Sequence, residues 1–252
     1  MLNYMKLLEE GAVMVFRKAI LIIHGFAGGT YDEEPLLFYL QPKLEFDVYN
    51  FTLPGHMTNL SSDVVYEDWI NAVNERIDKL ISMGYNKIYL VGHSMGGLLA
   101  THAAIKYTEV KKVVLIAPAF KYLSTADESS FKKAIKNGPE IIKTYHFGEV
   151  VSRILKVSVS QYKEFQKLVS LSQENPKKLT VPTLVIQGTS DKIVPYESSE
   201  KIFEEMTCPK WLIKIDGVTH DVFYGEKVSE ICNEIYKFLK VSNYNEEDIR
   251  NW

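Results

Sequence analysis

Short apolar runs recur along the chain, and turn residues bound each of them. The runs are too short for helices, and an unbroken apolar run is typical of a strand buried on both faces. The predicted strands are Val13 to Phe16, Ala19 to Ile23, Val48 to Phe51, Ile88 to Val91, Val113 to Ile116, Thr183 to Gln187 and Trp211 to Ile215. The pattern therefore predicts a sheet that is covered on both sides.

Between these runs, apolar residues recur at helical spacing. From Tyr66 to Met83 they include Trp69, Val73 and Ile77, and Gly84 follows as a helix stop. Further helices are predicted over Met95 to Tyr107, Tyr196 to Met206 and Lys227 to Leu239. Alternation of strands and helices predicts an α/β fold, with a mostly parallel central sheet and helices on both faces.

One segment interrupts the alternation. No strand-like run lies between Ile116 and Thr183, and helical patterns occur at Phe131 to Ile142 and Val150 to Leu171. An insertion of this length is expected to have structure of its own. We predict a core of residues 1–119 and 179–252 and a helical cap, or lid, over residues 120–178. An apolar stripe in the second helix is open to two further interpretations, contact with the core or with lipid; it comprises Leu155, Val159, Tyr162, Leu168 and Val169.

Composition narrows the class of protein. The 252 residues are 46% apolar and 24% charged with a net charge of -3, which fits one main globular domain and lacks the basic surface of a nucleic-acid binder. No run of 18 apolar residues is present, so no stable membrane insertion is expected and the cytoplasm is the predicted location. Cys208 and Cys232 lack metal or redox spacing and are predicted to be reduced thiols. The sequence gives no indication of oligomeric state.

The segment from Ile88 to Gly97 is the most informative stretch. It reads as a buried strand, then Gly92-His93-Ser94-Met95-Gly96, then a helix. A nucleophile at a tight turn between strand and helix needs small neighbours, because its backbone is strained and other chains pass close by. Ser94 is therefore the candidate nucleophile, and Gly92 and Gly96 form its elbow.

A serine hydroxyl needs a base, and the base needs an orienting acid. Asp191 follows the predicted strand Thr183 to Gln187, and His220 follows Trp211 to Ile215. The order serine, aspartate, histidine is the order used by hydrolases whose nucleophile lies on such an elbow. Asp216 and Asp221 lie near His220 in sequence and are alternative partners for it.

The remaining histidines near these motifs have structural interpretations. His93 is next to the nucleophile, and its side chain is expected to point away into the supporting structure. His24 and His56 are expected to anchor loops through hydrogen bonds. No group of His, Asp and Glu has metal-ligand spacing and no phosphate-binding loop is present, so neither metal nor cofactor is predicted.

Together these motifs resemble the α/β-hydrolase superfamily, close to bacterial carboxylesterases and monoacylglycerol lipases. The resemblance rests on His24-Gly25-Phe26, Leu53 to His56, Gly92 to Gly97, Gly188 to Pro195 and Gly217 to His220. It implies that the backbone amides of Phe26 and Met95 form the oxyanion hole and that residues 120–178 cover an acyl pocket. Many relatives have Gly-His-Gly where this chain has Gly55-His56-Met57, a difference at the pocket mouth.

The predicted function is hydrolysis of small carboxylic esters with short to medium acyl chains, through an acyl-enzyme on Ser94 and without a cofactor. Monoacylglycerols, aryl esters such as hydroxycinnamates, and thioesters are alternative substrates. An acyltransferase or a carbon-carbon hydrolase would use the same three side chains. An alternative from another class is a ligand receptor that kept the fold without turnover.

Overall fold

A computed structural model describes residues 18–56, 63–121 and 158–242 of the chain. The predicted strand at 13–16 and the predicted helix at 131–142 lie outside the described residues. The same holds for the C-terminal residues 243–252, which we expect to be frayed.

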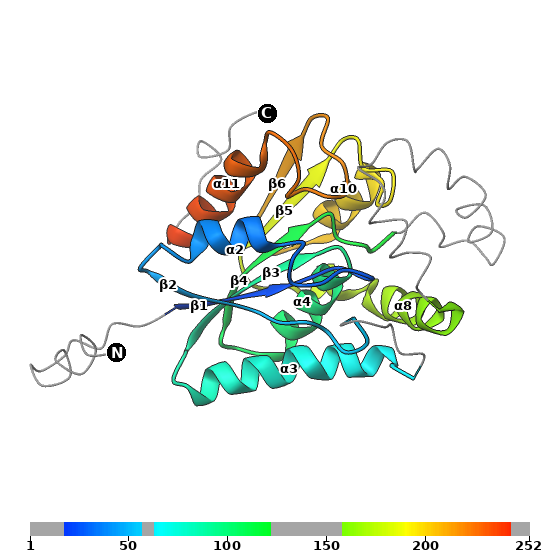
Figure 1. Ribbon diagram of the computed structural model, residues 1–252, viewed down its shortest axis with the longest axis horizontal. Helices are drawn as coiled ribbons and strands as arrows, with labels where there is room; N and C mark the ends of the chain where they lie inside the picture. Colours follow the sequence, from blue (N-terminus) through cyan, green and yellow to red (C-terminus); the bar gives the residue numbers. More distant parts are fainter. Residues whose placement is uncertain (1–17, 57–62, 122–157, 243–252) are drawn as a thin grey trace, which may run out of the picture.

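Six strands form one sheet in which every pairing is parallel. Their order is β2-β1-β3-β4-β5-β6 (Figure 1). The first strand, β1, therefore lies next to the edge strand β2, and the later strands continue on its other side to the opposite edge strand, β6. The six predicted strands within the described residues are all present. Their bounds are β1 Lys18–Ile23, β2 Phe46–Asn50, β3 Lys87–His93, β4 Val110–Ile116, β5 Thr183–Gly188 and β6 Lys210–Ile215.

Helices cover both faces, and each face has its own apolar core. One core lies under α3 (Tyr66–Ser82), α4 (Met95–Lys106), α8 (Val159–Ser172) and α10 (Tyr196–Glu205), and the other under α2 (Glu34–Leu40) and α11 (Val228–Lys240). In β1, Leu21 faces the first core and Ile22 the second, which explains why its apolar run does not alternate. In Figure 1, α2 and α11 lie together on the face opposite α3.

The short helix α2 was not predicted. It has seven residues, begins with a proline in its first turn, and buries only Leu36 and Leu40 deeply. Two buried positions in one short segment give too weak a periodic signal to separate a helix from a loop. A further single turn, α9 (Asn175–Lys178), follows α8 and was also not predicted.

Residues 150–157 of the predicted helix, with Leu155 of the apolar stripe, lie outside the described residues, and α8 begins at Val159. The Ser158 hydroxyl accepts a hydrogen bond from the Gln161 amide at 3.1 Å and caps the helix. Tyr162, Leu168 and Val169 pack into the core beside α3 and α4. Val159 is the first residue of the helix and is 59% exposed, so the core interpretation of the stripe does not hold for this residue.

Candidate active site

The sequence motifs gather at one edge of the sheet. Because all strands are parallel, their carboxyl ends share one edge, where ligands bind in open α/β sheets. The loop 24–29 follows β1, Ser94 follows β3, and Asp191 and His220 follow β5 and β6. Residues far apart in the sequence are therefore neighbours in the fold.

Ser94 occupies a strained turn between β3 and α4. Its φ of 53° and ψ of -115° lie where residues other than glycine are rare, at a cost of roughly 1–3 kcal/mol. The Ser94 amide donates to the Ile116 carbonyl at 2.8 Å, and the Ser94 carbonyl accepts from the amides of Gly97 and Ala119 at 3.0 and 3.2 Å. Hydrogen bonds to β4 and to the next loop thus hold the turn in this conformation.

Close backbone contacts explain the glycines of the elbow. A Cβ atom on Gly92 would lie 2.3 Å from the Gly96 carbonyl oxygen, and one on Gly96 would lie 2.1 Å from the Ile23 carbonyl oxygen. Gly25 packs against the serine itself, since a Cβ on Gly25 would lie 3.1 Å from the Cβ of Ser94. The loop after β1 therefore packs directly against Ser94.

Two backbone amides beside Ser94 are available to a ligand. Neither the Phe26 nor the Met95 amide donates to a partner among the described residues, whereas the Gly28 amide closes the loop onto the Gly25 carbonyl at 3.2 Å. Met95 is the first residue of α4, where the helix leaves its amides without internal partners. This is the arrangement that a developing oxyanion requires.

Asp191 and His220 form a buried pair. His220 Nδ1 donates to Asp191 Oδ2 at 2.8 Å, and the Gln187 side-chain amide donates to the same oxygen at 2.9 Å. The other oxygen, Oδ1, accepts from the amides of Ile193 and Val194 at 2.8 and 2.9 Å. Burial alone would raise the pKa of Asp191, but the charge and hydrogen bond of His220 and these two amides together lower it. The carboxylate therefore stays ionised and fixes the ring so that Nε2 is free to accept a proton.

The two alternative acids do not contact the His220 side chain among the described hydrogen bonds. Asp216 is exposed, and its Oδ1 accepts from the Thr189 hydroxyl at 3.0 Å. Asp221 is the residue after His220, and it makes no described ion pair with the imidazole. Asp191 is thus the carboxylate that orients His220 in this structure.

No hydrogen bond between the Ser94 hydroxyl and His220 occurs among the described residues. Ser94 and His220 are nevertheless close in the fold, because His93, the residue before Ser94, contacts His220. His93 Nε2 donates to the His220 carbonyl at 3.0 Å, and the rings of His93 and His220 have centroids 5.0 Å apart. A triad bond is often long before substrate binds. The structure therefore brings the loop of the base to the nucleophile without joining them.

Comparison with known proteins fits this arrangement. A family model described as the alpha/beta hydrolase fold matches residues 18–134, and a second, described as serine aminopeptidase S33, matches residues 132–227. The monoacylglycerol lipase of Paleococcus ferrophilus superimposes with a TM-score of 0.68 at 21% identity, covering 88% of this chain and 93% of that one. The chain has the α/β-hydrolase fold.

Several curated relatives of this chain are named as esterases or lipases. A putative esterase/lipase 2 of Mycoplasma pneumoniae is 28% identical over 82% of this chain and 84% of its own length. A carboxylesterase of Bacillus subtilis is 25% identical over 88% of this chain and 92% of its own. The expected enzyme class, a carboxylic ester hydrolase, is confirmed at the level of these names.

His24 and His56 anchor loops, as expected. His24 Nδ1 donates to the Gly25 carbonyl at 2.8 Å, and His24 Nε2 accepts from the Leu53 amide at 3.0 Å. Burial and the neighbouring His56 lower the pKa of His24 to about 3, so its ring is neutral. His56 Nδ1 donates to the Pro54 carbonyl at 2.9 Å. These bonds join the loop after β1 to the loop after β2.

The His93 side chain lies in the supporting structure, as predicted, but it contacts His220 from behind, and its partner Glu33 was missed. Its Nδ1 lies 3.0 Å from Oε1 of Glu33, and both side chains are buried. Glu33 precedes α2, where the sequence shows only a run of three acidic residues before a proline. No signal in one sequence marks such a residue as a partner of the elbow. Gln187, which contacts Asp191, was missed because a buried strand residue is usually read as core.

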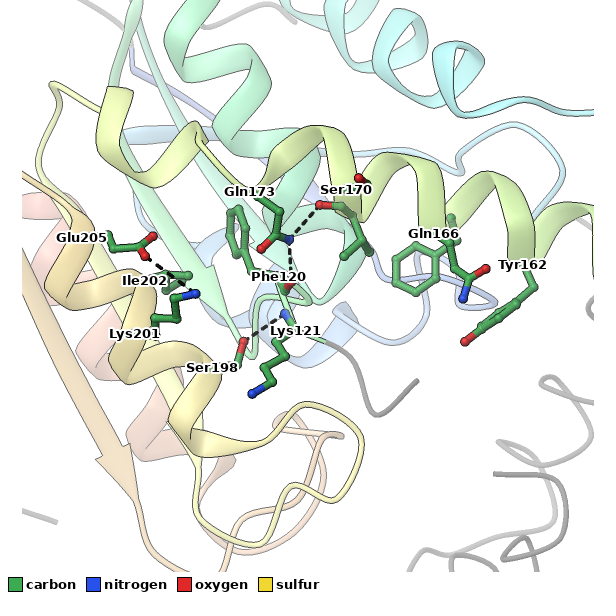
Figure 2. Close-up of a pocket in the computed structure, with 12 residues that line it drawn as sticks. Phe120, Lys121, Tyr162, Gln166, Ser170, Gln173, Ser198, Lys201, Ile202 and Glu205 are labelled. Atoms are coloured by element: carbon green, nitrogen blue, oxygen red, sulfur yellow. Dashed lines mark hydrogen bonds and ion pairs between the residues drawn. The ribbon is translucent and has the colours of Figure 1, made fainter. Parts of the chain in front are cut away.

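A pocket of about 410 Å³ lies between α8 and α10 (Figure 2). Its wall is linked to the candidate site, because the Phe165 ring stacks on Phe26 and Phe120 follows Ala119, which binds the Ser94 carbonyl. Ser94 itself does not line the pocket. The lining is mixed: Phe120, Tyr162, Phe165, Val169 and Ile202 with Lys121, Gln166, Ser170, Gln173, Ser198, Lys201 and Glu205.

Other classes of site were searched for in residues 18–56, 63–121 and 158–242. These residues contain no group of three or more His, Cys, Asp and Glu able to hold a metal ion. None of their helices is long and apolar enough to cross a bilayer. Cys208 and Cys232 are buried free thiols, and burial raises the pKa of Cys232 to about 12, which makes it unreactive.

Proposed function

We propose that this α/β hydrolase cleaves carboxylic esters through an acyl-enzyme formed on Ser94. The observation that carries the proposal is the state of the groups around Ser94. The Asp191 carboxylate is saturated with hydrogen bonds and fixes His220, while two backbone amides beside the serine have no described partner. A binding protein that had lost catalysis would have no need of the strained serine or of this oriented pair.

In the first half-reaction, His220 Nε2 accepts the proton of the Ser94 hydroxyl as the oxygen attacks the ester carbonyl. The carbonyl oxygen gains the negative charge and binds the amides of Phe26 and Met95. The imidazolium then donates its proton to the alkoxy oxygen, the bond from carbon to that oxygen breaks, and the alcohol leaves. The acyl group stays on Ser94 as an ester.

In the second half-reaction, His220 accepts a proton from water, which attacks the acyl carbon. The Ser94 oxygen leaves with the proton from the imidazolium, and the carboxylic acid is released. Asp191 remains ionised throughout, because the protons move on the opposite nitrogen of the ring. The chemistry requires a hydrogen bond between the Ser94 hydroxyl and His220 Nε2, which substrate binding can complete.

The pocket lined by Phe120 and Phe165, whose ring stacks on Phe26, supports a proposal for the substrate class. Its volume of about 410 Å³ is at the small end of ligand pockets, which favours an acyl chain below about ten carbons. Polar side chains such as Gln166 and Gln173 share the lining with phenyl rings. This mixed wall favours a monoacylglycerol, whose glycerol half carries hydroxyl groups, as a second candidate substrate.

The test is hydrolysis of p-nitrophenyl esters from acetate to palmitate, with Ser94→Ala and Ser82→Ala compared. Ser82 is the exposed last residue of α3, where its hydroxyl donates to the Lys79 carbonyl, and it serves as the matched serine control. We expect a maximum below about ten carbons and a loss of at least about 10³-fold in kcat for Ser94→Ala alone. A fluorophosphonate probe should label the peptide that contains Ser94. Equal activity in both variants would refute the proposal.

The same panel separates the alternatives. Monobutyrin, a hydroxycinnamate methyl ester and butyryl-coenzyme A test the glycerol, aryl and thioester classes with the same nucleophile. A sharp rise in rate only above the critical micelle concentration would indicate a lipase that acts on lipid surfaces. Saturable binding of esters without turnover would indicate the receptor alternative. The cap boundaries at 120 and 178 stay a prediction, which limited proteolysis of the intact protein can examine.

A further inference from the structure

A buried chain of side chains reaches the back of the candidate catalytic histidine. Glu33, immediately before α2, is 1% exposed, and its Oε1 lies 3.0 Å from Nδ1 of His93. His93 Nε2 in turn lies 3.0 Å from the carbonyl oxygen of His220. The chain therefore runs from the N-terminus of α2 through the end of β3 to the loop after β6.

The hydrogen bonds from Glu33 through His93 to His220 determine how many protons these groups hold. A carbonyl oxygen can only accept, so His93 Nε2 must carry a hydrogen. The contact between Nδ1 and Glu33 then needs exactly one more proton, held either by the imidazole or by the carboxyl. In both cases the pair is neutral overall, which keeps the cost of burying it low. Removing that proton would set a carboxylate against a ring nitrogen lone pair.

The bond from His93 matters because little else holds the backbone at His220. The segment between β6 and α11 forms no helix or strand, and the His220 carbonyl otherwise accepts only the Val222 amide, at 2.9 Å, among the described residues. Asp191 holds the imidazole from the other side. The residue is thus fixed at its ring by one carboxylate and at its main chain by His93.

We propose that Glu33 and His93 act as positioning residues that hold His220 by its main chain through one shared proton, so that loss of this proton sets the alkaline limit of activity. The proposal rests on the esterase function above, because it concerns the same histidine. It adds a second buried acid to the site, one that never touches substrate.

The charges around His93 favour the protonated pair. Burial by itself would lower the pKa of His93, but the hydrogen bond and charge of Glu33, with the charges of Asp221 and Asp32, raise it to about 9. Burial raises the pKa of Glu33 to about 7, although the hydrogen bond and charge of His93 oppose this rise.

Three rings complete the surroundings of His93: those of His220, Phe223 and the neutral His24. None of them supplies a fixed charge that would oppose the proton. The pair therefore keeps its shared proton at neutral pH and loses it as the pH rises through about 9.

The decisive comparison is Glu33→Gln with Glu33→Leu, assayed on p-nitrophenyl butyrate from pH 6 to 10.5 with the Ser94→Ala protein as the blank. In Glu33→Gln, the amide can donate to Nδ1 of a neutral His93, so the bond to His220 no longer depends on a titrating proton. In Glu33→Leu, Nδ1 has no partner at any pH. Glu234→Gln is the matched control, since Glu234 is also buried but lies on α11 and binds Lys237.

We expect kcat of the parent and of Glu234→Gln to fall about ten-fold between pH 8 and pH 10, as loss of one proton with a pKa of about 9 predicts. Glu33→Gln should change less than about two-fold over that range, and Glu33→Leu should lose about ten-fold at every pH. An alkaline limb that is the same in Glu33→Gln and the parent would overturn the proposal.

A second readout needs no turnover. In Ser94→Ala protein carrying ¹⁵N-histidine, both ring nitrogens of His93 should be protonated at pH 7, and Nδ1 alone should lose its proton as the pH rises. Nδ1 and Nε2 resonances of His93 that do not change between pH 7 and pH 10.5 would contradict the proposal even if Glu33→Leu failed to fold, because loss of the shared proton changes the state of Nδ1 whether the imidazole or the Glu33 carboxyl holds it. Absence of Ser94-dependent hydrolysis together with the expected spectrum would refute the esterase function and leave the proton-sharing pair.

Discussion

The ring of Phe165 lies stacked on the ring of Phe26, with centroids 4.7 Å apart and planes 10° from parallel. Trp69 and His56 meet the same Phe26 ring edge to face, at 5.9 Å each. Phe26 is therefore held by α8, by α3 and by the loop after β2. Because its backbone amide is a proposed oxyanion donor, packing on α8 positions a group that acts at Ser94.

Replacing Phe165 by leucine should lower kcat clearly while reducing the free energy of unfolding only modestly. Loss of the stacked pair and of part of the ring volume should cost about 1–2 kcal/mol of unfolding free energy. The Phe26 loop would lose one of its supports, so we expect kcat to fall roughly ten-fold, as for a partly displaced oxyanion donor. Urea denaturation and ester hydrolysis measure the two effects separately.

The control for this change is Phe238→Leu. Phe238 is 0% exposed and pairs with Trp211 at 5.7 Å, but it lies in the other core, below α11. It should cost a similar amount of stability and leave kcat within about two-fold. Equal losses of kcat in both variants would mean that Phe165 acts only through general stability.

The elbow glycines allow a sharp test of the backbone geometry. A Cβ on Gly96 would meet the Ile23 carbonyl oxygen at 2.1 Å, whereas one on Gly97 would meet the Pro118 Cβ at 3.0 Å. Gly96→Ala should therefore force the loop after β1 away from α4, at a cost of about 3 kcal/mol or more. Gly97→Ala gains helix propensity of about 1 kcal/mol against its tighter contact and should change stability little. Similar melting temperatures for the two variants would contradict this account.

Much of the fold could be predicted because the strong signals are local. The inner strands β1, β3, β4 and β5 contain apolar runs that are buried on both faces, and α3 appears as a repeat of Trp69, Val73 and Ile77. The elbow is equally local, since Gly92 and Gly96 flank Ser94. The order of Ser94, Asp191 and His220 then places three side chains at one sheet edge before any coordinates are known.

The contacts that support the site could not be predicted, because they join residues without a shared local pattern. Glu33 and His93 are 60 residues apart in sequence, and Glu33 precedes a helix too short to give a periodic signal. Gln187 looks like any residue of a buried strand until Asp191 is placed beside it. Val159 belongs to the helical repeat in the sequence but is exposed in the structure, because the first residue of α8 lies outside the part of the helix that packs on the core.

The histidine at the end of β1 should make the protein less stable in mild acid. The pKa of His24 is lowered from 6.5 to about 3, so the unfolded chain binds a proton that the folded protein does not. The stabilising effect of the neutral ring is complete above pH 6.5 and is lost as the pH falls from there towards about 3. The slope for one proton is about 1.4 kcal/mol per pH unit.

His24→Gln is the variant that isolates this slope, since its side-chain oxygen can still accept from the Leu53 amide. Glu33 opposes the effect of His24, because a raised carboxyl pKa adds stability as the pH falls from about 7. The informative quantity is therefore the difference between parent and variant. Urea denaturation between pH 5 and 7 measures the free energy of unfolding of both proteins. As the pH falls, that of the parent should decrease more steeply than that of His24→Gln, by about the slope expected for one proton. Parallel curves would mean that His24 titrates alike in both states.

The four hydrogen bonds on Asp191 predict how asparagine would behave in its place. The amides of Ile193 and Val194 both donate to Oδ1, so an asparagine would keep its oxygen there and turn its NH₂ group towards His220. That NH₂ would donate to Nδ1 and stabilise the tautomer whose Nε2 carries a hydrogen. A ring in this state cannot take the proton of Ser94, so kcat should fall by about 10⁴-fold.

The NH₂ group would also face the Gln187 side-chain amide, a second donor, which now binds Oδ2 at 2.9 Å. Asp191→Asn should therefore lose some stability as well, about 1–3 kcal/mol for the unsatisfied buried donor. Asp216→Asn is the control: its carboxylate is exposed and binds Thr189, so kcat should stay within about two-fold. Because the carboxylate is held so firmly, activity of Asp191→Asn above a tenth of the parent would mean that another acid orients His220 during turnover.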